Sequence, residues 1–168
     1  GSSWAKSDEV LLTCQDGYQP SVPVDRFKET QAYFAFERIG SRDFSVTVKA
    51  ENNKKMPLGP FYLIWKDGKL APFWTFQVVG VDLVSFQEQF PKVAPPENSA
   101  ASVKRGFLIF RKYCLQCHSI NGDGGAIGPE LNYPVNVTEY YKEAHLRKWI
   151  ENPFSIRFRT AMPPLPDD

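Results

Sequence analysis

Two cysteines and a histidine stand close together in the second half of the chain. They are Cys114, Cys117 and His118, in the run Cys-Leu-Gln-Cys-His. Two thiols at this spacing can each form a thioether bond to one edge of a porphyrin, and the residue that follows then lies beneath the metal. The pattern is therefore typical of covalent haem attachment, with His118 as the proximal ligand of the iron.

Zinc binding and dithiol redox chemistry are the alternatives for this cysteine pair. A zinc site needs four ligands, and outside the motif the chain offers only Cys14 and His145 as further cysteine or histidine side chains. The flanking residues do not follow the strand–helix–strand pattern in which thioredoxin-like pairs occur. Haem attachment is the favoured interpretation on both counts.

Composition limits the classes of protein to which the chain can belong. It has 168 residues, of which 42% are hydrophobic and 14% aromatic, enough for one large core or two small ones. The formal net charge is +1, which argues against a nucleic-acid partner. No apolar run is long enough to span a bilayer.

Residues 1–90 have the sequence pattern of β-structure. Short runs rich in β-branched and aromatic residues alternate with turn signals such as Asp-Gly. The predicted strands are Glu9–Cys14, Ala32–Glu37, Phe44–Lys49, Phe61–Lys66 and Thr75–Val84, with a bulge or bend at Gly80. We expect a mostly antiparallel β module. It contains no histidine and no glycine-rich phosphate loop, so we expect no catalytic site in it.

A proline-rich segment separates this module from the haem motif. Residues 91–101 contain three prolines followed by small polar residues, which predicts a partly stiff linker. From Val103 to Cys114 apolar side chains recur on one helical face, and Gly106 and Phe110 lie on that face four residues apart. A second unit over residues 102–168, beginning with a helix, is therefore expected.

Several short motifs of residues 102–168 follow the order found in monohaem class I c-type cytochromes. They are the Gly106–Phe110 element, the haem motif, the glycine-rich turn Asn121–Gly125, the run Gly128-Pro129-Glu130-Leu131, the stretch Leu146–Asn152 that runs into Pro153, and Met162-Pro163. This segment resembles that family, and the resemblance implies an all-α domain with one covalent haem c. The expected fold class is thus two domains, an N-terminal antiparallel β unit and a C-terminal all-α cytochrome c domain.

The resemblance also implies roles for residues outside the haem motif. The carbonyl of Pro129 would accept a hydrogen bond from Nδ1 of His118, orienting the ring and raising its basicity. Met162 would be the distal ligand, because thioether sulfur opposite imidazole favours reduced iron. Trp149 would cover the haem edge. The alternatives are core packing for Met162, and His145 as the sixth ligand, although solvent exposure is the favoured interpretation of that histidine.

One departure from the family concerns the end of the chain. The family continues past its Met-Pro pair with a helix that packs on the face of Gly106 and Phe110, whereas this chain has six residues after Met162. Either that helix has been trimmed, or the β module or another subunit covers the face.

Residues 8–88 more loosely resemble the later part of a sulfite-oxidase-type molybdopterin domain. The likeness is carried by Cys14–Tyr18, Leu58–Trp65 and Val78–Val84. The cysteine, histidine and arginine side chains with which that family holds molybdenum and pterin have no counterpart here. The resemblance therefore implies a degenerate module without its cofactor, with a role in docking and with Cys14 as a buried structural thiol.

Two protein ligands on the iron would leave no position there for a substrate. We therefore expect an electron-transfer protein and not an enzyme, with one covalent haem c and a redox partner protein that the β module helps to dock. The resemblance implies a periplasmic location, where this family acquires its haem. The alternatives are the cytochrome subunit of a haem- or molybdenum-dependent oxidoreductase, and a haem redox or gas sensor in which Met162 detaches.

Overall fold

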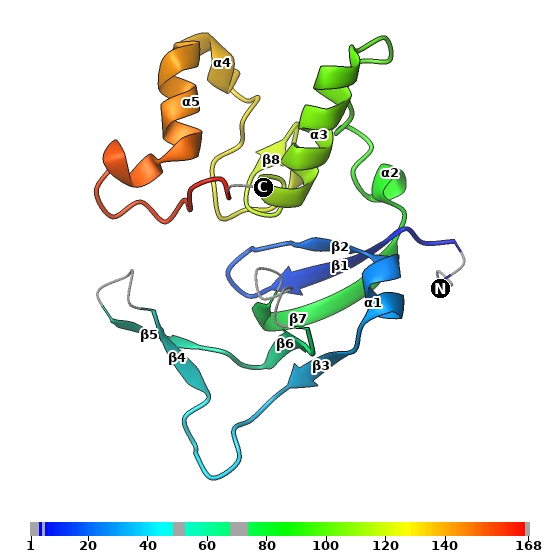
Figure 1. The fold of residues 1–168 in the computed structure, drawn as a ribbon, viewed down its shortest axis with the longest axis vertical. Helices are drawn as coiled ribbons and strands as arrows, with labels where there is room; N and C mark the ends of the chain where they lie inside the picture. The colour runs from blue at the N-terminus through cyan, green and yellow to red at the C-terminus, as the bar shows by residue number, and fades with distance from the viewer. Residues whose placement is uncertain (1–3, 5, 49–52, 68–73, 167–168) are drawn as a thin grey trace.

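The computed structural model describes residues 4, 6–48, 53–67 and 74–166, and Figure 1 shows their arrangement. The strands are β1 (Glu9–Cys14), β2 (Ser21–Pro23), β3 (Ala32–Ala35), β4 (Ser45–Val48), β5 (Lys54–Pro57), β6 (Phe61–Trp65), β7 (Thr75–Val84), β8 (Ser119–Ile120) and β9 (Asp123–Gly124). The helices are α1 (Val24–Glu29), α2 (Phe86–Gln89), α3 (Ala101–Tyr113), α4 (Val137–Tyr140) and α5 (Glu143–Glu151), followed by the 3₁₀ turn η3 (Pro153–Ser155).

The largest element is a five-stranded antiparallel sheet with the order β2-β1-β7-β6-β3. Its longest pairing joins β1 to β7, from Glu9 opposite Val84 to Cys14 opposite Val78. The register shifts between Thr13 and Cys14, so Val79 is the extra residue of a bulge beside Gly80. In the lower left of Figure 1, β4 and β5 form a separate two-stranded ladder that projects from this sheet.

Strand β1 is buried on both faces. Successive side chains of a strand point to opposite faces, so Val10 and Leu12 enter one hydrophobic cluster and Leu11 enters another. The first cluster lies between the sheet and α1, and its largest fully buried side chain is Trp65. The run of adjacent apolar residues in β1 is thus explained by burial on two sides.

The second hydrophobic cluster joins the sheet to the C-terminal half of the chain. Its buried members are Leu11, Phe86, Phe90, Val93 and Leu115, with Phe107 and Phe110 of α3 packed against them. These residues come from β1, α2, the segment predicted as a linker, and the haem motif. The apolar face of α3 is therefore partly covered by the sheet module and by α2.

The predicted all-α C-terminal domain is wrong. The C-terminal half contains the antiparallel β8–β9 hairpin and long stretches without regular structure, so the chain as a whole is a mixed α and β fold. The physical reason lies in the turn between those strands, because Asn121 and Gly122 both have positive φ, 56° and 84°. An Asn-Gly pair in this conformation is the preferred two-residue hairpin turn.

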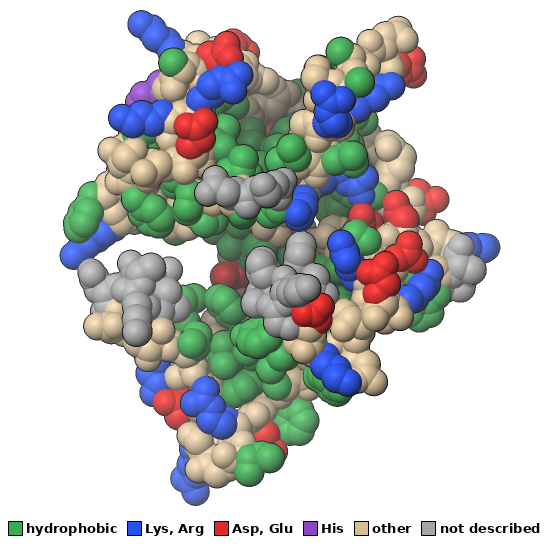
Figure 2. Space-filling view, in the orientation of Figure 1, with side chains coloured by type: hydrophobic (Ala, Val, Ile, Leu, Met, Phe, Trp, Pro, Cys, Tyr) green, Lys and Arg blue, Asp and Glu red, His purple; other side chains and the backbone are tan. Residues whose placement is uncertain are grey.

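No helix within the described ranges is long and apolar enough to cross a bilayer. On the face shown in Figure 2, acidic and basic side chains are interspersed over both halves of the molecule.

Candidate functional site

The Cys114–His118 motif directly follows α3. Cys114 caps this helix in helical conformation, and its N–H donates to the carbonyl of Phe110 at 2.9 Å. The N–H groups of Cys117 and His118 then both donate to the carbonyl of Cys114, at 3.1 and 2.9 Å. The two thiols and the imidazole are therefore presented by a single tight turn at the end of one helix.

Both motif cysteines are free, half-buried thiols. Burial raises the pKa of the Cys114 thiol. The pKa of Cys117 is raised to about 11, first by burial and then by the negative charges of Asp16 and Cys114. Redox-active cysteine pairs depend on a lowered thiol pKa, so these surroundings do not favour the dithiol alternative.

Among the described residues, the imidazole of His118 is hydrogen-bonded through one nitrogen only. Its Nδ1 lies 2.8 Å from the carbonyl oxygen of Pro129. A carbonyl can only accept, so Nδ1 carries the proton and Nε2 keeps its lone pair for a metal. This is the hydrogen bond that the cytochrome resemblance implies, and it sets the orientation of the ring.

Gly128 lets the chain lie against this ring. A Cβ at this position would stand 2.6 Å from Nδ1 of His118, closer than real Cβ contacts come. The N–H of Gly128 also donates to the carbonyl of Cys117 at 2.7 Å. The backbone before Pro129 is thus bonded to the motif itself, and only glycine fits there.

A fixed carboxylate organises the loop after the motif. Glu130 accepts hydrogen bonds from the backbone N–H groups of Asn121, Gly122 and Asn132, at 2.9, 3.0 and 2.8 Å. Burial raises the pKa of this carboxyl, but hydrogen bonds from these N–H groups and from Ser119 outweigh it and lower the pKa to about 2. Sequence reasoning missed this role, although Glu130 stands directly after Pro129 in the motif.

Trp149 and Met162 form a second group of site residues. The indole Nε1 of Trp149 donates to the Sδ of Met162 at 3.1 Å. The tail that carries Met162 is bonded to α5, because the N–H of Leu165 donates to the carbonyl of Ile150 at 3.0 Å. Helix α5 itself has Glu143 in its first turn and ends at Glu151. Its C-cap Asn152 stands directly before Pro153, as helix-terminus rules expect.

His145 lies on the exposed side of α5. Its ring stacks on that of Tyr141, with centroids 5.2 Å apart, and Tyr141 also stacks on Trp149 at 6.3 Å. The structure thus brings the predicted site residues together in two groups, one of Cys114, Cys117, His118 and Pro129 and one of Trp149 and Met162. Within the described ranges, no hydrogen bond or ring contact joins the two groups.

The donor set fits haem c. It consists of two free thiols, one imidazole with Nε2 available and one thioether, which are the groups that a covalent haem with His and Met ligation uses. Across the described part of the chain, no three His, Cys, Asp or Glu side chains are grouped so as to hold a metal ion. Haem needs no such group, because the porphyrin supplies four of the ligands.

The comparisons with known proteins show no family for this chain. No protein-family model, no curated protein and no solved structure matches it. The assignment of the site therefore depends on its residue types, their spacing and the geometry described above.

Proposed function

We propose that this chain is a c-type cytochrome that transfers single electrons and catalyses no reaction of its own. The observation that carries the proposal is the 2.8 Å contact between Nδ1 of His118 and the carbonyl of Pro129, which leaves Nε2 available next to two free thiols. Haem c, when bound, takes up and releases one electron at its iron.

The residues of the first group would hold and orient the haem. Cys114 and Cys117 would form the thioether bonds, and both enter that reaction from half-buried, protonated thiols. His118 would be the proximal ligand. The carbonyl of Pro129 strengthens the imidazole as a donor, because it draws on the Nδ1 proton.

The second group would complete the coordination. A thioether sulfur has two lone pairs, so the bond from Trp149 Nε1 to Met162 Sδ leaves one pair for the iron. Met162 would then be the distal ligand, and Trp149 would hold its sulfur and cover the haem edge. With both axial positions taken by side chains, a substrate has no site on the metal, which supports electron transfer over catalysis.

A redox partner protein and a periplasmic location complete the proposal. Covalent haem of this kind is attached outside the cytoplasmic membrane in the family that the motif resembles. The β module would help to dock the partner. The surface of that module, and not the haem motif, would then select which protein binds. The net charge of +1 and the interspersed charges on the face shown in Figure 2 support a protein partner over nucleic acid.

Covalent haem attachment tests the proposal directly. The chain is produced in cells that make c-type cytochromes, and its intact mass, metal content and haem type are measured. We expect one iron and one covalent haem c per chain, with no zinc and no molybdenum. Cys114→Ser and Cys117→Ser each remove a thioether, whereas Cys14→Ser, which changes a buried thiol of the sheet core, is the matched control and keeps full attachment.

Two results would contradict the proposal. One is a wild-type protein that carries zinc or no covalent group after expression in those cells. The other is rapid binding of carbon monoxide to the reduced protein without denaturant, which would indicate an open iron position and favour a gas or redox sensor.

A further inference from the structure

The turn between β1 and β2 is bonded to the haem motif. We name this turn, Gln15–Pro20, the sheet turn. The N–H of Gln19 donates at 2.9 Å to the carbonyl of Gln116, which stands between the two motif cysteines. The N–H of Ala126, in the loop that leads to Gly128, donates at 3.0 Å to the carbonyl of Gly17. The sheet turn is therefore hydrogen-bonded both to the Cys114–His118 motif and to the loop that follows it.

The sheet turn is itself hydrogen-bonded within the β module. The N–H of Cys14 donates to the carbonyl of Tyr18 at 3.0 Å, and the N–H of Gly17 donates to the carbonyl of Cys14 at 3.1 Å. The carboxylate of Asp16 accepts from the N–H of Tyr18 at 3.0 Å. Pro20 is fully buried. Because these bonds tie the turn to the sheet core, it cannot shift without disturbing that core.

Gly17 has no room for a larger side chain on the side of Ala126. Its φ is +89°, and a Cβ there would lie 3.3 Å from the Cβ of Ala126. A larger residue at position 17 would therefore press on the loop that contains Ala126, which we call the haem loop, and would also strain the turn.

The bonds continue from the haem loop to the proximal histidine. Next to Ala126, the N–H of Gly125 is shared between the carbonyls of Leu115 and His118, at 2.9 and 3.1 Å. Two residues further along the chain, Gly128 lies against the imidazole and precedes Pro129. The position of Ala126 is therefore linked, through short backbone bonds, to the carbonyl that orients His118.

We propose that the sheet turn is a positioning element of the haem site, acting through Gly17 and Gln19 on Ala126 and Gln116. This inference rests on the proposed function. Its consequence is that the β module does more than dock a partner: a partner that shifts the β1–β2 hairpin changes the surroundings of the haem. The alternative is that the turn only attaches the two halves of the molecule to each other.

Substitution of Gly17 separates these two roles. Gly17→Ala places a methyl group against Ala126. Gly40→Ala is a matched control, since Gly40 also has positive φ (75°) but a Cβ there meets nothing within 4 Å in the described part of the chain. Both variants are measured as holoproteins, by reduction potential, by the near-infrared band of sulfur-ligated iron and by hydrogen exchange of the Ala126 and Gln19 amides. If either alanine variant fails to fold, Gly17→Asn and Gly40→Asn replace them, because Asn tolerates positive φ.

The expected result is specific to Gly17. Exchange of the Ala126 amide accelerates about tenfold, the ratio that corresponds to about 1.4 kcal/mol, or one hydrogen bond, and the reduction potential shifts from that of wild type. The Gly40 variant keeps the wild-type potential, band and exchange rates. An accelerated exchange with an unchanged potential and band would overturn the inference, and so would equal shifts in the Gly17 and Gly40 variants.

The wild-type protein distinguishes a failure here from a failure of the proposed function. Wild type without covalent haem would overturn both. Wild type with haem and a normal band, together with a Gly17 variant of unchanged potential, would overturn only the role of the sheet turn.

Discussion

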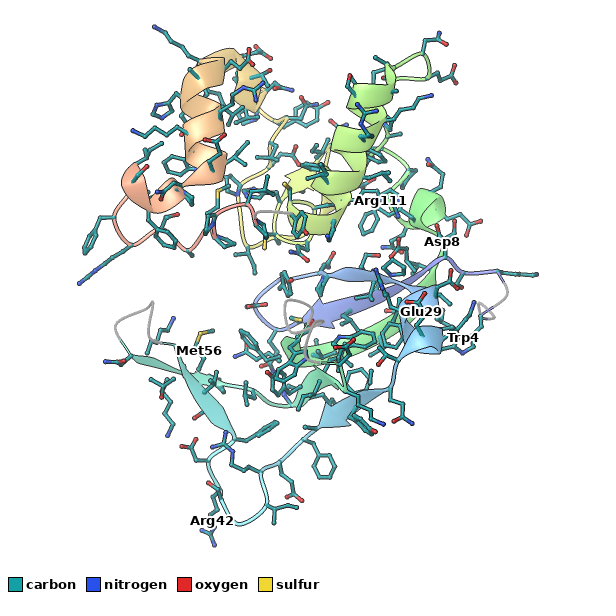
Figure 3. The ribbon with its side chains drawn as sticks, viewed as in Figure 1. Trp4, Asp8, Glu29, Arg42, Met56 and Arg111 are labelled. Atoms are coloured by element: carbon teal, nitrogen blue, oxygen red, sulfur yellow. The ribbon has the colours of Figure 1, made fainter. Side chains whose placement is uncertain are left out.

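Arg111 and Glu9 are 102 residues apart in the sequence and form an ion pair with 2.7 Å between Nη2 and Oε1. Their side chains are 23% and 10% exposed, so the pair is largely withdrawn from water. The guanidinium also lies over the ring of Phe86, 3.4 Å from its centroid. In Figure 3, Arg111 stands at the end of α3 that faces the sheet. This pair ties the helix before the haem motif to β1.

Arg111→Ala leaves Glu9 buried without its partner. Removing one member of a buried pair costs about 3 kcal/mol, and we expect this loss in the free energy of unfolding, measured by urea denaturation at neutral pH. The matched control is Arg147→Ala, which breaks the exposed pair with Glu143 and costs less than about 0.5 kcal/mol. Equal losses of stability in the two variants would show that burial does not increase the contribution of the Arg111–Glu9 pair.

The pH dependence of this loss has a definite sign. Burial, which outweighs the effects of Ser21 and Arg111, already raises the pKa of Glu9 above its ordinary value of 4.5. Loss of the guanidinium raises it further. The cost of Arg111→Ala therefore decreases as the pH falls and this carboxyl takes up a proton.

Gly128→Ala is expected to disturb the proximal ligand. The new methyl group cannot occupy the space beside His118, so either the ring or the Pro129 carbonyl moves and their hydrogen bond is lost. Loss of a hydrogen bond that orients a metal ligand weakens metal binding about tenfold or more. We expect at least that reduction in the yield of six-coordinate haem, measured by visible spectroscopy at equal protein concentration.

Gly106→Ala is the control for this substitution. A Cβ at Gly106 meets nothing within 4 Å among the described residues, although the position lies inside α3. Alanine in a helix interior is more favourable than glycine by up to about 1 kcal/mol, so this variant keeps the wild-type spectrum and gains stability. A wild-type spectrum in Gly128→Ala would contradict the geometry assigned to His118.

Glu130→Gln tests the carboxylate that holds the loop after the motif. The neutral amide accepts the backbone hydrogen bonds more weakly, and we expect a loss of about 1 kcal/mol after allowance for solvent screening. The pKa of Glu130 is lowered from 4.5 to about 2. Its contribution is therefore present above pH 4.5 and lost as the pH falls towards 2.

Thermal or urea denaturation between neutral pH and pH 2 measures this effect. The difference between wild type and Glu130→Gln should vanish at the acid end of the range. Glu151→Gln, at an exposed position of α5, serves as the control and stays within about 0.5 kcal/mol of wild type. A difference that grows on acidification would have the wrong sign for a lowered pKa.

Met162→Ala tests the distal ligand. We expect the near-infrared band of sulfur-ligated iron to disappear and the reduction potential to fall, because a thioether ligand favours reduced iron. The chain has one other methionine, Met56. It lies on the β4–β5 ladder (Figure 3), so Met56→Ala should leave the band and the potential unchanged. A band that persists in Met162→Ala would refute the assignment, and its loss on His145→Ala would point to the histidine instead.

Four of the five strands of the main sheet, β1, β3, β6 and β7, could be predicted because their signal is local, whereas the three-residue strand β2 was not predicted. The residues of β1 and β7 were expected with the bounds that the structure shows, since β-branched and aromatic runs define a strand by themselves. The helices α1 and α2 were missed, as helices of six and four residues carry too little pattern to stand out. The predicted strand Phe44–Lys49 is observed as Ser45–Val48, and Lys49 lies outside the described residues.

The prediction of an all-α domain failed for a different reason. It was taken from a resemblance carried by the haem motif and a few residues around it, and those residues say little about the chain between them. The Asn121-Gly122 pair was a local hairpin signal that could have corrected it. The packing of Phe107 and Phe110 onto α2 and the sheet had no such signal, because an apolar helix face does not specify its partner.

The sequence alone led to the chemistry proposed for the candidate site. The spacing of Cys114, Cys117 and His118 is a property of five consecutive residues, so no other part of the chain is needed to recognise it. Only the tertiary structure decided what surrounds them. The contact of Gly17 with Ala126 and the pair of Glu9 with Arg111 join residues more than a hundred positions apart. No local spacing encodes such a contact, because it forms only when the sheet packs against the Cys114–His118 motif and the residues around it.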